Sequence, residues 1–210
     1  MLAEIRTGNT QSTEGSVNPA RAGRFGELTT GGAVGKYYEL SKQGRIFTAA
    51  MQTVASLGTA FTATVASIWI WNPSGSNHNV SILAGGVTVV DAAGATVRGY
   101  FWVSTPDPAG VIPVTNTALT VRPALLGAGY TSVARAFTVS TLPSVPVCVR
   151  VFPLAYAQVV TTSTSAGPLA AVDYVDGAIC LSPNTGVGLQ AISGTNLTGL
   201  ESITWAEIPI

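Results

Sequence analysis

The sequence predicts an all-β protein, a jelly-roll-like antiparallel β-sandwich that follows an extended N-terminal arm. Short segments rich in Val, Ile, Thr and aromatic residues recur along the chain, and clusters of Gly, Pro, Asn and Ser separate them. Strand-type and helix-type segments do not alternate, which argues against an α/β fold. The first 24 residues show neither the two-residue period of a strand nor the period of a helix. We therefore expect an arm with short leading strands over residues 1–45 and a jelly-roll body over residues 46–210.

The composition indicates a protein that buries much of its outer surface in partners. Only 10% of the 210 residues are charged, and acidic and basic residues cancel, whereas soluble domains usually carry about 25% charged residues. No run reaches the ~18 consecutive apolar residues of a membrane span. A net charge of zero does not favour binding to nucleic acid or to an anionic membrane. We expect protein partners, including other copies of the chain, and neither a membrane nor a nucleic acid.

The N-terminal arm carries an unusual share of the charges and lacks the apolar pattern needed to fold alone. We expect it to become ordered on contact with another chain. The first residues show no basic stretch followed by an apolar core, so we expect cytosolic synthesis and reduced thiols. Five charged residues are the candidate contacts of the arm: Glu4, Arg6, Glu14, Arg21 and Arg24.

Three glycine-led segments follow the arm, at 23–28, 35–40 and 44–49. Each begins with glycine, continues with a cation and contains aromatic or apolar residues. This pattern predicts short strands joined by glycine turns.

The central part of the body, residues 61–103, contains three strand-type segments separated by turn residues. In the first of them, alternation places Ile68 and Ile70 on one face and Trp69 and Trp71 on the other. Both faces are apolar, which indicates a strand covered on both sides. We expect a second sheet to cover one face and a neighbouring subunit to cover the other.

The remainder of the body continues in the same way. A Pro-rich loop is expected at 105–113, and the stretch 124–132 is the one that resembles a helical turn, shortened by two glycines. Asp176-Gly177 lies between two β-type segments and predicts a type I′ hairpin. The other β-type segments are 119–121, 133–141, 145–160, 187–192 and 200–208.

No set of residues in the sequence predicts catalysis, a cofactor or a metal site. His78 is the only histidine and lies in a turn, so zinc binding lacks a ligand set and a Ser-His-Asp triad lacks a G-x-S-x-G partner. Asp173 and Asp176 do not have the spacing of a calcium loop. Cys148 and Cys180 each lie within an apolar run, which favours buried structural cysteines over a disulfide or a metal site. We therefore expect a protein that is not an enzyme.

Aromatic residues of the predicted strands are the remaining candidates for a functional role. Such residues more often fill a core or a subunit interface than stack on a sugar. The candidate core or interface aromatics are Trp69, Trp71, Trp102 and Trp205. A carbohydrate-binding module is the alternative, and it would require these rings to be exposed.

Short motifs at both ends and in the middle of the chain resemble small virion structural proteins of tailed bacteriophages. The motifs are 23–28 (GRFGEL), 35–40 (GKYYEL), 44–50 (GRIFTAA), 72–77 (NPSGSN), 176–179 (DGAI), 183–187 (PNTGV) and 203–209 (ITWAEIP). Among such virion components, capsid decoration (cement) proteins are commonly jelly-roll trimers that clamp the major capsid protein.

The resemblance implies a capsid decoration protein on the surface of the virion, made in the host cytoplasm. Its implied partners are the major capsid protein and two further copies of itself, with the arm lying across capsid subunits. A tail, baseplate or head-fibre component is the alternative within the same resemblance.

Overall fold

The computed structural model describes residues 35–58, 60–65, 67–91, 97–105, 115–153, 169–193 and 197–210. The chain divides into two units, Met1–Glu39 and Leu40–Ile210, and the second contains the β-sandwich. The expected strand at 23–28 and the five candidate contacts of the arm lie outside the described residues.

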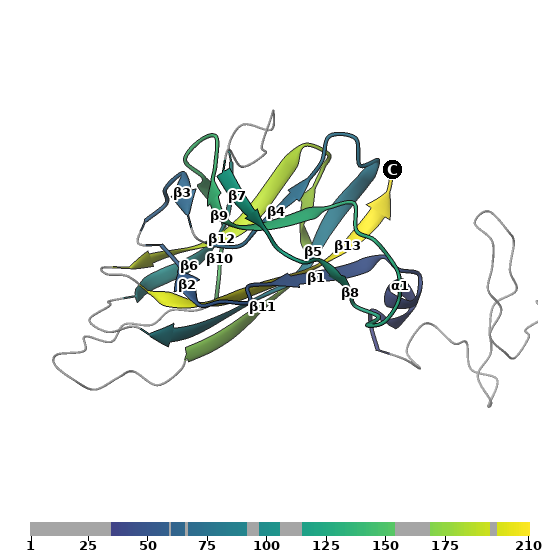
Figure 1. The fold of residues 1–210 in the computed structure, drawn as a ribbon, viewed down its shortest axis with the longest axis horizontal. Helices are drawn as coiled ribbons and strands as arrows, with labels where there is room; N and C mark the ends of the chain where they lie inside the picture. The colour runs from purple at the N-terminus through teal and green to yellow at the C-terminus, as the bar shows by residue number, and fades with distance from the viewer. Residues whose placement is uncertain are drawn as a thin grey trace, which may run out of the picture. The chain divides into compact units, whose positions relative to one another are not determined.

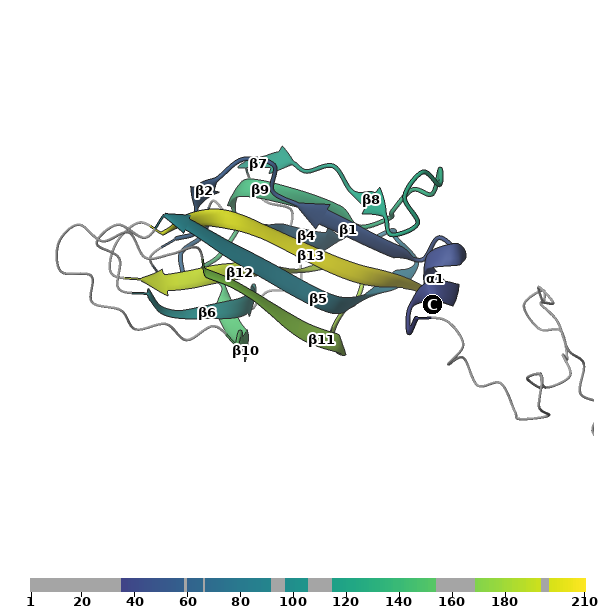
Figure 2. The ribbon, with the colours of Figure 1, turned by 90° about the horizontal axis from the view of Figure 1, so that it is seen from below.

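Two antiparallel sheets form the sandwich, as the sequence predicts (Figure 1). Sheet 1 has the order β11 (Leu169–Leu181), β5 (His78–Asp91), β13 (Thr198–Pro209), β1 (Ile46–Ala50) and β8 (Arg122–Pro123), and β2 (Ala55–Ser56) also pairs with β13. Sheet 2 has the order β10 (Val147–Val151), β6 (Val97–Ser104), β12 (Thr185–Ser193), β4 (Trp69–Asn72), β9 (Arg135–Thr141) and β3 (Thr64–Val65), and β7 (Thr115–Ala118) pairs with β9. Figure 2 shows β11, β5, β13 and β1 side by side in this order.

The strand pairing is that of a jelly roll. Eight strands pair in a nested way, the first with the last: β1 with β13, β4 with β12, β5 with β11, and β6 with β10. Because the partners of each nested pair lie far apart in the sequence, the eight strands roll up into two facing sheets. The predicted jelly-roll fold is therefore confirmed. Further strands extend the two sheets: β8 pairs with β1 in sheet 1, and in sheet 2 β9 pairs with β4 and is followed by β3 and β7.

The main core lies between the two sheets and follows the alternation of the strands. In β13, Ile203 and Trp205 are buried, whereas Ser202 and Thr204 on the other face are partly exposed. The largest buried side chains of this core include Phe47, Ile70, Ile82, Trp102, Leu189 and Trp205.

A second, smaller core lies on the other face of sheet 2. It contains Trp69 and Trp71 of β4 with Val103, Phe137 and Leu142. Phe61 and Phe101 pack against it with their rings edge to face, 5.3 Å between centroids. The face of β4 that was expected to meet a neighbouring subunit is therefore covered by the chain itself, with Trp69 2% and Trp71 5% exposed.

Glycines of β12 make room for the indole of Trp69. A Cβ atom at Gly186 or Gly188 would lie 2.5 Å from an atom of this ring. Since β12 is the neighbour of β4, these two glycines allow the ring to lie flat over the sheet.

The segment 35–40 contains part of a helix in place of the expected strand. Helix α1 spans Tyr38–Lys42, with Glu39 in its first turn and Lys42 in its last, as the helix dipole favours. The backbone N–H groups of Gly44 and Arg45 donate to the carbonyls of Ser41 and Leu40, and Gly44 has φ of 73°. This is a Schellman motif, so the glycine that was expected to join two strands ends a helix instead.

The expected hairpin at Asp176-Gly177 is a bulge within one strand. Both residues have positive φ, 51° and 88°, as a type I′ turn requires, yet the residues on either side pair with the same strand, β5. The register shifts between Tyr174, which pairs with Ala84, and Ile179, which pairs with Ile82. The stretch of β11 between these two pairs is three residues longer than the stretch of β5 that it faces. The stretch 124–132 forms turns and no helix.

Candidate protein-binding edge

The most unusual surface of the described residues is the edge strand β10. All five of its side chains are exposed, and β6 is its only partner among the described strands. Val147, Val149 and Val151 are 47%, 49% and 68% exposed, and Val145 just before the strand is 55% exposed. An exposed, apolar edge strand is a surface on which another chain can pack.

A second edge strand also carries exposed apolar side chains. Strand β11 is the edge of sheet 1 and lies at the same side of the sandwich as β10 (Figure 2). Val172 and Tyr174 of β11 are 51% and 71% exposed. We call the exposed valines of β10 and of the residues just before it the valine edge: Val145, Val147, Val149 and Val151.

A buried carboxylate holds the two edge strands together. The guanidinium of Arg150 on β10 donates two hydrogen bonds to Asp173 on β11, from Nε to Oδ2 at 2.9 Å and from its terminal nitrogen to Oδ1 at 3.1 Å. The indole N–H of Trp102 donates to the same Oδ2 at 2.9 Å. The hydrogen bonds and the charge of Asp173 raise the pKa of Arg150. Arg150, the single cation of β10, is therefore neutralised by a carboxylate of the same chain. The exposed valines of the strand lie beside this ion pair.

A second buried carboxyl group, Glu201 of β13, connects the two sheets through the core. It accepts a hydrogen bond from the backbone N–H of Ile68 at 2.6 Å and another from the hydroxyl of Tyr100 on β6. Glu201 is 2% exposed, and its burial raises the pKa well above the usual value, opposed by the hydrogen bond from Ile68.

Glu207, near the end of the same strand, fixes a loop of the chain. Its carboxylate accepts hydrogen bonds from the backbone N–H groups of Val133 and Ala134, at 3.1 and 3.0 Å, and from the Ser132 hydroxyl. The indole N–H of Trp205 adds a fourth donor at 3.2 Å. These donors all come from the chain itself, so the role of this carboxylate is to hold the loop.

Sequence reasoning missed both glutamates, although the sequence contains a signal for them. In β13 the core-facing positions are Glu201, Ile203, Trp205 and Glu207. An acidic residue at a core-facing position of an alternating strand predicts a buried carboxyl group with partners.

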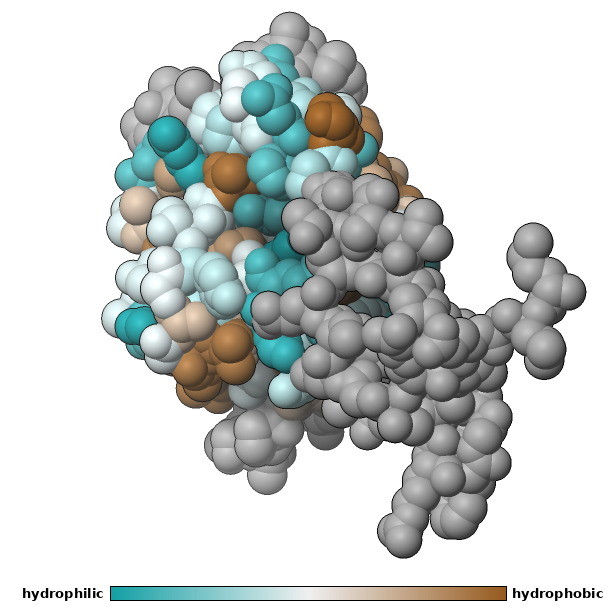
Figure 3. All heavy atoms as spheres, turned by 90° about the vertical axis from the view of Figure 1, so that its right-hand side faces the viewer, coloured by the Kyte–Doolittle hydropathy of each residue, from teal (hydrophilic) through white to brown (hydrophobic). Residues whose placement is uncertain are grey.

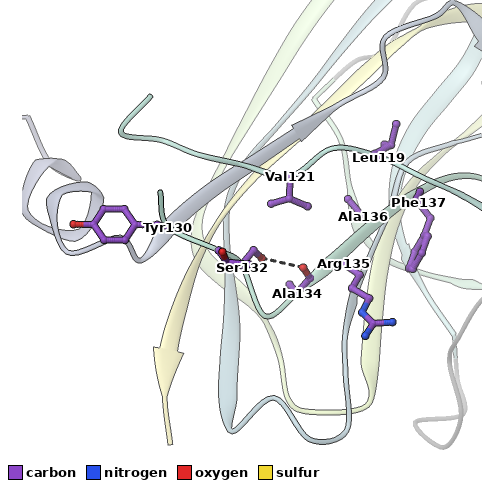
Figure 4. Close-up of a pocket in the computed structure, with 10 residues that line it drawn as sticks. Leu119, Val121, Tyr130, Ser132, Ala134, Arg135, Ala136 and Phe137 are labelled. Atoms are coloured by element: carbon purple, nitrogen blue, oxygen red, sulfur yellow. Dashed lines mark hydrogen bonds between the residues drawn. The ribbon is translucent and has the colours of Figure 1, made fainter. Parts of the chain in front are cut away.

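A groove of about 400 Å³ beside β9 is the other candidate site (Figure 4). Leu119 and Val121 line it from the β7–β8 connection and Ala136 from β9, while Tyr130 lies at its far end. Among its described lining residues the only charged one is Arg135, whose guanidinium lies 5.7 Å from the centre of the Trp71 ring. These lining residues include no carboxylate, thiol or imidazole, and their side-chain hydroxyl groups are those of Tyr130, Thr131 and Ser132.

On the side of the molecule that Figure 3 presents, the apolar side chains in view form separate spots among polar ones. Isolated apolar residues of this kind are normal on a protein surface.

The candidate residues of the sequence analysis are not brought together into one site. Trp69, Trp71, Trp102 and Trp205 are all buried, in two different cores. The Nδ1 atom of His78 lies 2.6 Å from the carbonyl oxygen of Ser76, a contact within its own turn. Asp176 lies in the bulge of β11. No cluster of three or more potential metal ligands occurs within the described residues.

The two cysteines are exposed, and the expectation that they are buried is wrong. Cys148 lies on the edge strand β10, and Cys180 lies on the edge strand β11 beyond its bulge. Their apolar neighbours belong to edge strands, where an apolar run is not a sign of burial. Neither thiol forms a disulfide bond.

No helix among the described residues is long and apolar enough to cross a membrane. In comparisons with known proteins, no family model, curated protein or solved structure matches the chain.

Proposed function

We propose that the protein is a structural subunit of a virion, a capsid decoration protein that binds to and stabilises a shell of major capsid protein. The observation that carries the proposal is the valine edge, an exposed apolar surface of the protein-binding kind. The few charges of the chain, the jelly-roll fold and the resemblance of the sequence motifs support the same function.

The mechanism of such a protein is mechanical. Apolar area removed from water contributes about 25 cal/mol per Å², and a shell repeats each contact over many symmetric copies. A rigid body is needed for such a contact to resist outward pressure. The Arg150–Asp173 pair and the Glu201 hydrogen bonds supply this rigidity, because they tie strands of opposite sheets together.

Binding to assembled shells tests the proposal. Purified protein is mixed with empty shells of the major capsid protein, and bound protein is measured after sedimentation. We expect saturable binding with a fixed ratio to the capsid protein, and an increase in the temperature at which the shells come apart. Absence of binding at saturating protein would contradict the proposal.

Electron microscopy of virions separates this function from the alternative within the same class. Density for the protein on the shell supports decoration, whereas density on the tail, baseplate or head fibres supports the alternative. A carbohydrate-binding module would have to use exposed tyrosines such as Tyr174, because the indoles of all four tryptophans are buried and cannot stack on a sugar.

A further inference from the structure

We propose that Tyr130 fixes helix α1, which connects the N-terminal arm to the strands of the β-sandwich, and that it prepares the arm for attachment in this way. The part about attachment rests on the proposed function, because it takes the arm to be a segment that binds to the shell. The part about the helix rests on the contacts of Tyr130 alone.

Helix α1 needs support from outside itself. It has five residues, and none of them is buried. A helix this short gains too little from its own hydrogen bonds to be stable in water. The carbonyl groups of its last turn also have no partner within the helix. The contacts that keep α1 formed must therefore come from other parts of the chain.

Tyr130, at the left in Figure 4, makes two contacts at the C-terminal end of α1. Its hydroxyl donates a hydrogen bond to the carbonyl oxygen of Lys42, the last residue of the helix, at 2.9 Å. Its ring lies against Gly44, the glycine of the Schellman motif, where a Cβ atom would be 2.4 Å from the nearest ring atom. Gly44 also has a φ of 73°, so glycine is needed at this position for two reasons. We call the two contacts the Tyr130 clasp.

The loop that carries Tyr130 is fixed to sheet 1 on both sides of the tyrosine. Before it, the backbone N–H of Ala124 donates to the carbonyl of Ile46 on β1, at 2.8 Å. After it, the Glu207 carboxylate of β13 accepts the hydrogen bonds of residues 132–134. The Tyr130 clasp therefore connects the end of α1 to a rigid part of the β-sandwich.

A helix that is already fixed lowers the entropic cost of attachment. Each residue that becomes ordered on binding loses conformational entropy. The clasp orders the end of α1 before the arm meets its partner, so these residues add nothing to that cost. Loss of the clasp should therefore weaken attachment through the arm while the β-sandwich stays folded.

Hydrogen exchange at two backbone amides tests the clasp directly. The N–H groups of Gly44 and Arg45 close the Schellman motif, so their exchange reports whether the end of α1 is formed. In Y130A we expect their protection to fall about tenfold. In Y130F, which keeps the ring and loses the hydroxyl, the protection should fall less.

The matched control for exchange is L126A, in the same loop, since Leu126 is 76% exposed. Its amides at Gly44 and Arg45 should exchange as in the native protein, and the amides of β13 should be unchanged in all three variants. Unchanged protection of Gly44 and Arg45 in Y130A would overturn the clasp.

Binding of the full-length protein to shells tests the consequence for attachment. In the sedimentation assay we expect Y130A to bind more weakly than the native protein, with a similar unfolding midpoint. The factor should be no greater than the loss of protection, because the affinity scales with the fraction of molecules in which α1 is formed.

The control for lost stability is G188A, which disturbs the packing of Trp69 in sheet 2. This variant should bind to shells as the native protein does. If G188A binds as weakly as Y130A, binding follows the stability of the body, and the role of the clasp in attachment is overturned.

The outcomes also separate this inference from the proposed function. If the native protein binds no shells, the proposed function is overturned, and exchange at Gly44 and Arg45 still decides on the clasp. If Y130A loosens the end of α1 but binds to shells like the native protein, the clasp is supported and its role in attachment is overturned.

Discussion

At the scale of single residues, Glu201 links the stability of the body to pH. Burial raises its pKa well above the ordinary value of 4.5, and the unfolded chain has the ordinary value. The folded protein therefore keeps a proton that the unfolded chain releases as the pH rises past 4.5. Stability from this group is fully present below that pH and is lost as the pH rises toward the raised pKa.

The variant E201Q should remove this dependence, because an amide does not ionise and still accepts the hydrogen bond from Ile68. We expect the free energy of unfolding of E201Q, minus that of the native protein, to increase from pH 4.5 to neutral pH. Urea denaturation at a series of pH values measures this difference. A difference that is constant over the range would show that Glu201 does not keep its proton in the fold.

The close packing of Trp69 against glycine gives a second prediction at this scale. In G188A the new Cβ atom would lie 2.5 Å from the Trp69 ring and 2.6 Å from the carbonyl oxygen of Ile68. Because the backbone oxygen cannot move away easily, we expect a loss of about 1–3 kcal/mol in the free energy of unfolding. The control is G75A, where nothing lies within 4 Å of the new atom; its unfolding midpoint should be nearly unchanged. Equal effects of the two substitutions would contradict the packing.

At the scale of strands, the ion pair between Arg150 and Asp173 connects β10 of sheet 2 to β11 of sheet 1. The variant R150A removes both hydrogen bonds to Asp173 and leaves that carboxylate with the Trp102 indole as its remaining donor in the site. We expect the backbone amides of β10 to exchange with deuterium faster, while those of β13 exchange as before. Unchanged exchange in β10 would show that the strand is held by β6 alone.

The strands also show which parts of the fold can be predicted from sequence. The sheet type and the alternation of β13 depend on local pattern, and both were predicted. The partner of a strand does not depend on local pattern. Asp176-Gly177 has the backbone of a tight turn, but the chain after it returns to β5 and makes a bulge. Cys148 lies in an apolar run that looks buried, but its exposure follows from the position of β10 at the edge of a sheet. The valine edge could not be predicted for the same reason.

At the scale of the whole molecule, attachment to a shell should depend on the N-terminal arm. From the sequence we expect the arm to become ordered on contact with its partner, which costs about 1–2 kcal/mol per residue for the backbone and requires compensating contacts. Deletion of residues 1–22 should leave the body folded, because every described strand of the jelly roll lies after Gly44. Circular dichroism should be unchanged, and binding to shells in the sedimentation assay should be much weaker. Unchanged affinity and occupancy would assign attachment to the body instead.

The nested pairing of the jelly roll has a consequence for the synthesis of the protein. Strand β1 is the first of the body to leave the ribosome, and its long partner β13 includes almost the last residues of the chain. The same late strand pairs with β5 and supplies Glu201 and Glu207. Sheet 1 therefore cannot form completely until β13 has left the ribosome, and its closure should have the slow rate expected of contacts between distant parts of a chain.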